Sequence, residues 1–193
     1  MTKNENNGRY DPRNQLNDLT GKEWLKLTKS FIFSERCVED KEAFNHPAPF
    51  LVRDIEKFIS MFTKENMLVV DPFAGSGTTM LASLNLGRRN ISIDLNPEYR
   101  QLALKRIQKK NRGFDEDLRY ITGNSLIELE RIEEIDYIIT SPPYHNILRN
   151  DGKGLREENK KGDHRTGSRI GIEYYSDEES DLGNQETYVK FLK

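Results

Sequence analysis

A short run of apolar residues that leads into a glycine-containing turn constrains the fold of this chain more than any other feature. The apolar run 67–70 is followed by Asp71-Pro72-Phe73-Ala74-Gly75-Ser76-Gly77, and a helical pattern begins at Thr78. A strand, a glycine turn and a helix in this order are typical of a nucleotide-binding parallel sheet. Because glycine has no side chain, Gly75 and Gly77 let the backbone approach a ligand closely.

Strands and helices alternate along the central part of the chain. After a helix expected near residues 51–62, strands are expected at 67–71, 90–94, 119–122 and 136–140, and the helices between them begin at Thr78, Pro97 and Ser125. Proline is well tolerated at a first helical position, and Thr78 and Thr79 lie where helix N-cap groups belong. Short links between alternating strands and helices predict an α/β fold with a doubly wound, Rossmann-like parallel sheet.

A second motif, Thr140-Ser141-Pro142-Pro143-Tyr144, lies at the end of the last expected strand. In open parallel sheets, ligands bind outside the carboxyl ends of the strands. The glycine turn and this proline motif both lie at such ends, so they can face one shared crevice. Two rival nucleotide sites are disfavoured, because a phosphate-binding loop would have Lys in place of Thr78 and a dinucleotide loop would have Gly in place of Met80.

Taken together, the two motifs resemble those of the amino-group DNA methyltransferases. This family transfers a methyl group from S-adenosylmethionine to an exocyclic nitrogen of cytosine or adenine. Phe73-Ala74-Gly75-Ser76-Gly77 matches its cofactor motif, Phe-x-Gly-x-Gly, and Ser141-Pro142-Pro143-Tyr144 matches its catalytic motif, Asp, Asn or Ser followed by Pro-Pro-Tyr. The resemblance implies a sheet of the S-adenosylmethionine-dependent methyltransferase type, S-adenosylmethionine as cofactor, double-stranded DNA as partner, and a bacterial restriction or epigenetic system.

The cofactor motif supplies the first group of candidate binding residues. The resemblance implies that Asp71 and Phe73 line the methionine and adenosine parts of the cofactor, beside Ala74, Gly75 and Gly77 of the motif.

Three polar residues elsewhere are further candidates for the cofactor site. Asp94 ends the second strand, where a carboxylate can accept hydrogen bonds from ribose hydroxyls, although it can also cap the next helix. Asn124, at the next strand end, can contact the adenine ring, but its Gly-Asn-Ser turn explains it equally well. His46 lies in the segment 45–50, which resembles an additional cofactor motif of the family; a purely structural histidine is the alternative.

The Ser-Pro-Pro-Tyr motif has the groups that methylation of an amino nitrogen needs. The lone pair of such a nitrogen is delocalised into the ring, so acceptors must hold both amino hydrogens and direct the lone pair at the methyl group. The Ser141 hydroxyl and the Pro142 carbonyl suit this role, the Pro142-Pro143 pair stiffens the turn, and Tyr144 offers a face for an extruded base. A proline loop in which Tyr144 only packs is the alternative. Within the family, Ser at the first position favours cytosine N4; adenine N6 or an RNA base amino group remains the alternative.

Composition limits the remaining possibilities. The 193 residues, 35% of them hydrophobic, fit one domain with a core, and a net charge of -2 gives no global basic field for nucleic acid. The basic residues of segment 145–173 can grip phosphates, but interleaved acidic residues make a merely solvated loop equally plausible. The single Cys37 fits a reducing cytoplasm, and no stretch approaches the roughly 20 apolar residues of a membrane span. His46, His145 and His164 lack ligand-like spacing, so no metal site is expected.

Three segments are expected along the chain: a polar arm at 1–19, a methyltransferase core at 20–144, and a flexible loop with the start of a helix at 145–193. The resemblance implies further strands after the catalytic one, so the sheet is expected to be incomplete and strand 136–140 to form an exposed edge. We therefore expect a truncated enzyme, in preference to half of a split enzyme whose second polypeptide supplies the missing strands and target recognition. A noncatalytic remnant is the alternative from another class.

Overall fold

The computed structural model describes residues 11, 13–144, 180–185 and 187–191, and it divides the chain into two compact units, Met1–Ser141 and Pro142–Lys193. The first unit contains, in chain order, α1 (Gly21–Leu27), the 3-10 turns η1 (Val38–Asp40) and η2 (Ala43–Asn45), α2 (Val52–Phe62), β1 (Leu68–Asp71), α3 (Thr78–Asn85), β2 (Arg89–Asp94), α4 (Pro97–Gln108), β3 (Leu118–Thr122), α5 (Ser125–Leu129) and β4 (Tyr137–Ile138). The described part of the second unit contains η4 (Leu182–Asn184) and α6 (Tyr188–Phe191). The beginning of the predicted arm and the predicted basic loop lie outside the described residues.

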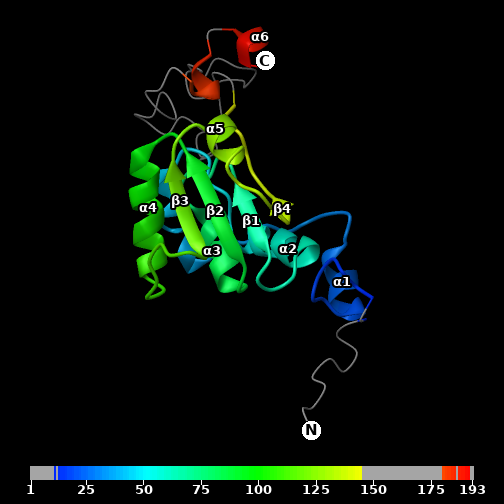
Figure 1. Ribbon diagram of the computed structural model, residues 1–193. Helices are drawn as coiled ribbons and strands as arrows, with labels where there is room; N and C mark the ends of the chain where they lie inside the picture. Colours follow the sequence, from blue (N-terminus) through cyan, green and yellow to red (C-terminus); the bar gives the residue numbers. More distant parts are fainter. Residues whose placement is uncertain (1–10, 12, 145–179, 186, 192–193) are drawn as a thin grey trace, which may run out of the picture. The chain divides into compact units, whose positions relative to one another are not determined.

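The four strands form a parallel sheet in the order β3-β2-β1-β4, with β3 and β4 at its edges (Figure 1). β1 pairs with β2 from Leu68↔Arg89 to Asp71↔Ser92. The chain therefore builds the sheet outward from β1 to β3 and then returns to the other side of β1. Ligands of doubly wound sheets bind at the carboxyl ends where this order reverses, which here is between β1 and β4.

Both faces of the sheet are covered. Successive side chains of a strand point to opposite faces, so neighbouring residues of β1 belong to different buried clusters. Val69 of β1 belongs to a buried cluster with residues of α2, α3 and α4, among them Ile59 and Ile107. Val70 belongs to a second cluster, which is packed by Leu129 of α5 and by residues that follow it. The predicted doubly wound α/β fold is confirmed.

Helices α2 and α4 begin where side chains accept hydrogen bonds from their first backbone N–H groups. Asn96 accepts a hydrogen bond from the N–H of Glu98 at 2.9 Å, and Pro97 takes the first position of α4. Asp40 of η1 serves α2 from a distance, since its Oδ1 accepts the N–H of Val52 at 2.9 Å. This hydrogen bond attaches η1 to the start of α2.

The observed elements agree closely with the predicted ones, except at the last strand. Helices α3, α4 and α5 begin at the predicted residues Thr78, Pro97 and Ser125. β4 is shorter than the predicted strand 136–140, because its ladder to β1 ends where the N–H of Ile139 donates to the carbonyl of Val70.

The outer side of β4 forms the predicted sheet edge. No strand among the described residues pairs with that side, and the side chain of Ile138 is 49% exposed. Within the described ranges, no helix is long and apolar enough to cross a membrane.

Candidate functional site

The glycine turn after β1 has a backbone conformation that other residues rarely adopt. The φ angle is +48° at Gly75 and +73° at Gly77, both in the left-handed region. A Cβ atom on Gly75 would lie 2.7 Å from Nε2 of His46, and one on Gly77 would lie 2.5 Å from Cβ of Ala103 in α4. Besides the close ligand approach predicted from the sequence, packing within the protein itself requires both glycines.

Side chains from three different elements fix the peptide groups of this turn. Asp94, at the end of β2, accepts the N–H of Gly75 at 2.8 Å. Tyr120 of β3 donates its hydroxyl to the carbonyl of Gly75 at 2.7 Å. Arg106 of α4 donates from Nη1 to the carbonyl of Ser76 at 2.7 Å. The turn is therefore preorganised by the protein, which lowers the entropic cost of binding a ligand there.

The half-buried carboxylate of Asp94 connects the turn to the next helix. Its Oδ2 holds Gly75, and its Oδ1 accepts the N–H of Asn96 at 2.9 Å. The backbone of β2 joins the same region, because the carbonyl of Ile93 accepts the N–H of Ala74 at 2.9 Å. Asp94 thus lies beside the glycine turn, as the sequence predicts for a ribose-binding residue, and it also orders the start of α4.

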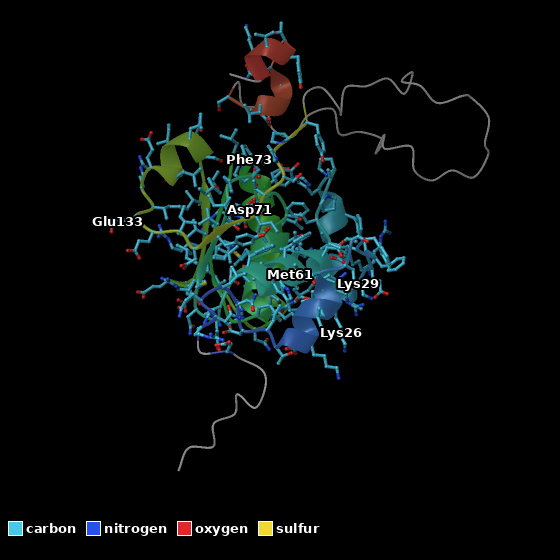
Figure 2. All side chains as sticks on the ribbon, turned by 90° about the vertical axis from the view of Figure 1, so that its right-hand side faces the viewer. Lys26, Lys29, Met61, Asp71, Phe73 and Glu133 are labelled. Atoms are coloured by element: carbon cyan, nitrogen blue, oxygen red, sulfur yellow. The ribbon has the colours of Figure 1, made fainter. Side chains whose placement is uncertain are left out.

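Asp71 is a buried carboxylate that links the two sequence motifs. Its side chain is 1% exposed; Oδ2 accepts the hydroxyl of Thr79 at 2.5 Å, and Oδ1 accepts the hydroxyl of Thr140 at 2.7 Å and the N–H of Phe73 at 3.1 Å. Burial raises the pKa of Asp71 although these three donors favour its charged form. Figure 2 shows Asp71 deep among the side chains, with the half-buried Phe73 above it.

The catalytic part of the second motif, Ser141-Pro142-Pro143-Tyr144, follows β4 and begins one residue after Thr140. Ser141 is half-buried and directly follows Thr140, whose hydroxyl donates to Asp71. Pro142, Pro143 and Tyr144 belong to the second unit, and the Tyr144 side chain is 53% exposed.

His46 and Asn124 both lie near the glycine turn. The ring of His46 packs against Gly75 and meets the ring of Tyr99 edge-on, with 4.6 Å between centroids. The backbone N–H of Ala48 donates to Nδ1 of His46 at 3.2 Å.

Asn124 combines a local role with a position at the same edge of the sheet. Its Oδ1 accepts the N–H of Leu126 at 3.0 Å and caps α5, which is the turn chemistry left open by the sequence. The next residue, Ser125, donates its hydroxyl to the carbonyl of Pro72. The start of α5 is therefore attached to the cofactor motif.

Sequence reasoning missed Tyr120 and Arg106 and assigned the two threonines incorrectly. The N-cap of α3 is Gly77, without a side-chain cap; Thr78 accepts a hydrogen bond from Arg106 and Thr79 donates to Asp71. Burial raises the pKa of Tyr120 far above its usual value, and the charges of Asp94 and Asp71 add to this effect. Arg106 shares the buried face of α4 with Ala103, three residues earlier, so helical periodicity could have identified it.

No cluster of three or more possible metal ligands occurs among the residues that the structure describes. The candidate site consists of hydrogen-bonding groups around a glycine turn, at the carboxyl ends of β1 and β2.

Comparison with known families identifies the class of protein. The model of the DNA methylase family, N6_N4_Mtase, matches residues 2–105, which is more than half of the chain. The chain therefore belongs to this family of amino-methyltransferases, as its motifs predict. Enzymes of the family depend on S-adenosylmethionine and include both N6-adenine and N4-cytosine enzymes, so membership does not decide the target base.

This chain matches only part of the length of each relative. The chain is 38% identical over 107 residues to the type II methyltransferase M2.DpnII of Streptococcus pneumoniae, which is 53% of this chain and 36% of that protein. It is 32% identical over 96 residues to the DNA adenine methyltransferase YhdJ of Escherichia coli, which is 48% of this chain and 32% of that protein. The solved structure of TrmN from Thermus thermophilus aligns with a TM-score of 0.45 at 21% identity, over 57% of this chain and 34% of that one. The chain thus spans about a third of these curated relatives.

Proposed function

We propose that this chain binds S-adenosylmethionine at the glycine turn and provides the cofactor and catalytic motifs of a site-specific DNA methyltransferase acting on cytosine N4. The observation that carries the proposal is the hydrogen bond from Thr140 to Asp71, at 2.7 Å. It holds Ser141, the first residue of the proline motif, close to the strand end from which the glycine turn begins. The switch point between β1 and β4 supports the same assignment, since ligands of such sheets bind there.

On the cofactor side, we assign the ribose hydroxyls to Asp94, whose carboxylate already holds the turn. Asn124 is assigned to the adenine ring because it begins the helix that follows β3. His46 is assigned to the methionine end, since its ring packs against Gly75. Phe73 and the turn backbone from Ala74 to Gly77 would line the remaining surface, while Asp71 would act mainly by shaping the turn.

On the base side, the chain's own groups hold and orient the target amino group. The bound cofactor supplies a methyl group on a positively charged sulfur. The Ser141 hydroxyl and the Pro142 carbonyl accept the two amino hydrogens, which directs the nitrogen lone pair toward that methyl group. Pro143 restricts the backbone, and the exposed ring of Tyr144 stacks on a base that has left the duplex.

Cytosine is proposed because Ser, in place of Asp or Asn, begins the proline motif. Adenine is the second candidate, and the observation in its favour is the 32% identity to a relative named as a DNA adenine methyltransferase. Half of a split enzyme, in which a second polypeptide supplies target recognition, is a further candidate. The observation in its favour is the unpaired outer side of β4 among the described residues. A noncatalytic remnant predicts no product under any condition.

The test is transfer of labelled methyl from S-adenosylmethionine to mixed-sequence DNA, followed by mass spectrometry of the nucleosides. The assay is run with the chain alone and with the product of the adjoining reading frame. N4-methylcytosine is the expected methylated base. Methylation that appears only when the polypeptide from the adjoining reading frame is added would establish the split enzyme. N6-methyladenine would overturn the base assignment, and no methylated base in either assay, with folded protein, would overturn the enzymatic proposal.

A further inference from the structure

Arg106 is a buried cation that lies behind the glycine turn. Its side chain is 2% exposed on the buried face of α4. Nη1 donates to the carbonyl and hydroxyl oxygens of Ser76 at 2.7 and 3.2 Å and to the hydroxyl of Thr78 at 2.9 Å. Nη2 donates to the carbonyl of Glu39 at 3.3 Å. One guanidinium therefore joins α4, the glycine turn, the start of α3 and η1.

The charge of Arg106 has no carboxylate partner within ion-pair distance among the described residues, and its Nε is buried without a hydrogen bond. Burial lowers the pKa of Arg106, while the more distant charges of Asp40, Glu42 and Glu39 oppose that shift. Burying a cation in this way is unfavourable, and a packed apolar side chain of similar volume often gives equal or greater stability. Stability alone therefore does not account for an arginine at this position.

The contacts of Arg106 do account for it. Ser76 stands between two glycines with left-handed backbone conformations, and glycine has the widest choice of backbone conformations, so a partner is needed to hold the Ser76 carbonyl in one orientation. Arg106 holds that carbonyl, and the same Nη1 atom bonds the hydroxyl of Thr78, the first residue of α3. The glycine turn and the start of α3 are thus held by one side chain.

We propose that Arg106 is a positioning residue for S-adenosylmethionine, which acts through Ser76 and Thr78 to keep the glycine turn in its binding conformation. The inference rests on the proposed cofactor site and assigns to that site a residue that lies behind the turn. If loss of Arg106 left the turn in this conformation only a tenth of the time, the apparent dissociation constant for the cofactor would rise about tenfold.

The first experiment measures S-adenosylmethionine binding to the full chain by isothermal titration calorimetry, with thermal melting of the same samples. Arg106→Met keeps most of the side-chain volume and removes the charge and donors. Its dissociation constant is expected to rise by about tenfold or more. Its melting temperature is expected to fall about as far as that of the control variant Arg88→Met, because both variants leave carbonyl oxygens without their donor. Arg88→Met is the matched control, because Arg88 is also largely buried but bonds Thr63 and Leu86 at the other end of β2. It should lower the melting temperature and leave cofactor affinity unchanged.

Two further variants separate a positioning role from a structural one. In Arg106→Lys the charge remains, but a single ammonium replaces the two nitrogens that bond Ser76 and Glu39, so the affinity for cofactor should still fall. Cofactor binding by Arg106→Lys therefore tests the proposal if Arg106→Met does not fold. The effects of Arg106→Met and Thr78→Val should be less than additive, because each removes the same hydrogen bond.

The outcomes distinguish this inference from the proposed function. If the wild-type chain binds cofactor and both Arg106 variants bind it equally well, the positioning role is wrong and the cofactor site stands. If the folded wild-type chain does not bind S-adenosylmethionine, the proposed cofactor site is wrong and the inference falls with it. In an active assembly, a rise in KM for S-adenosylmethionine with little change in kcat supports positioning. A fall in kcat with an unchanged KM contradicts it.

Discussion

The two motifs of this chain are held in very different ways. The glycine turn receives side chains from β2, β3 and α4, through Asp94, Tyr120 and Arg106. Within the first unit, the proline motif begins one residue after Thr140, whose hydroxyl bonds to Asp71. The comparison indicates that the cofactor turn is largely built by the elements around it. The base-binding motif is fixed at its start and continues into residues of the second unit.

The largest expected effect comes from Tyr144→Ala. If Tyr144 only stacks on the target base, the active assembly should lose methyl transfer by at least about hundredfold, since orientation of the reacting group is lost. The dissociation constant for S-adenosylmethionine should remain within about twofold, because the glycine turn is unaffected. Labelled-methyl transfer and calorimetry measure the two quantities. Equal losses of transfer and cofactor affinity would contradict the separation between the two motifs.

Asp71→Ala tests the connection between the motifs. The change leaves the hydroxyls of Thr79 and Thr140 and the N–H of Phe73 without their buried acceptor, so the free energy of unfolding should fall by about 3 kcal/mol. Urea denaturation measures it. Asp71→Asn is the control, since it keeps the shape and one acceptor oxygen and should cost less. Stability equal to wild type in the Ala variant would show that Asp71 does not hold the two strand ends together.

Asp94→Ala tests the cofactor side alone. Loss of the ribose acceptor and of the bond to Gly75 should weaken S-adenosylmethionine binding by about 1–3 kcal/mol, the scale of hydrogen bonds to a charged group. Asp136→Ala is a matched control at the opposite end of the sheet, where Asp136 accepts the N–H of Leu68. Calorimetry should show a weaker affinity in the first variant only, and an unchanged affinity in Asp94→Ala would remove this residue from the site.

The smallest effect is the pH dependence that Asp71 contributes. Because burial raises the pKa of Asp71 in the folded state, the folded protein holds this proton more tightly than the unfolded chain. The stability from this group is present below the unfolded pKa and is lost as the pH rises through the folded pKa. The unfolding free energy of wild type minus that of Asp71→Asn should therefore decrease as the pH rises above about 4. Denaturation curves at several pH values measure this difference, and an increase with pH would contradict the direction of the shift.

Much of the fold could be predicted from local sequence. The starts of α4 and α5 follow from Asn96-Pro97 and Asn124, which act on backbone groups within two residues. The strand and glycine turn around Asp71 are local patterns of the same kind. Family membership likewise follows from two short motifs.

The site contacts that could not be predicted join residues far apart in the chain. Tyr120 reaches Gly75 across 45 residues, and Arg106 reaches Ser76 across 30. Neither contact leaves a local signal beyond a buried position on a strand or helix. The packing of His46 and Ala103 against the two glycines is also a tertiary contact, so the sequence indicated a need for glycine without its packing cause.

The most direct test of the account is titration of S-adenosylmethionine into the full chain of 193 residues, with Asp94→Ala and Asp136→Ala beside it. The account predicts saturable binding of one cofactor per chain, weakened in Asp94→Ala and unchanged in Asp136→Ala. Absence of binding to the folded wild-type chain, or equal affinity in all three proteins, would contradict a cofactor site at the glycine turn.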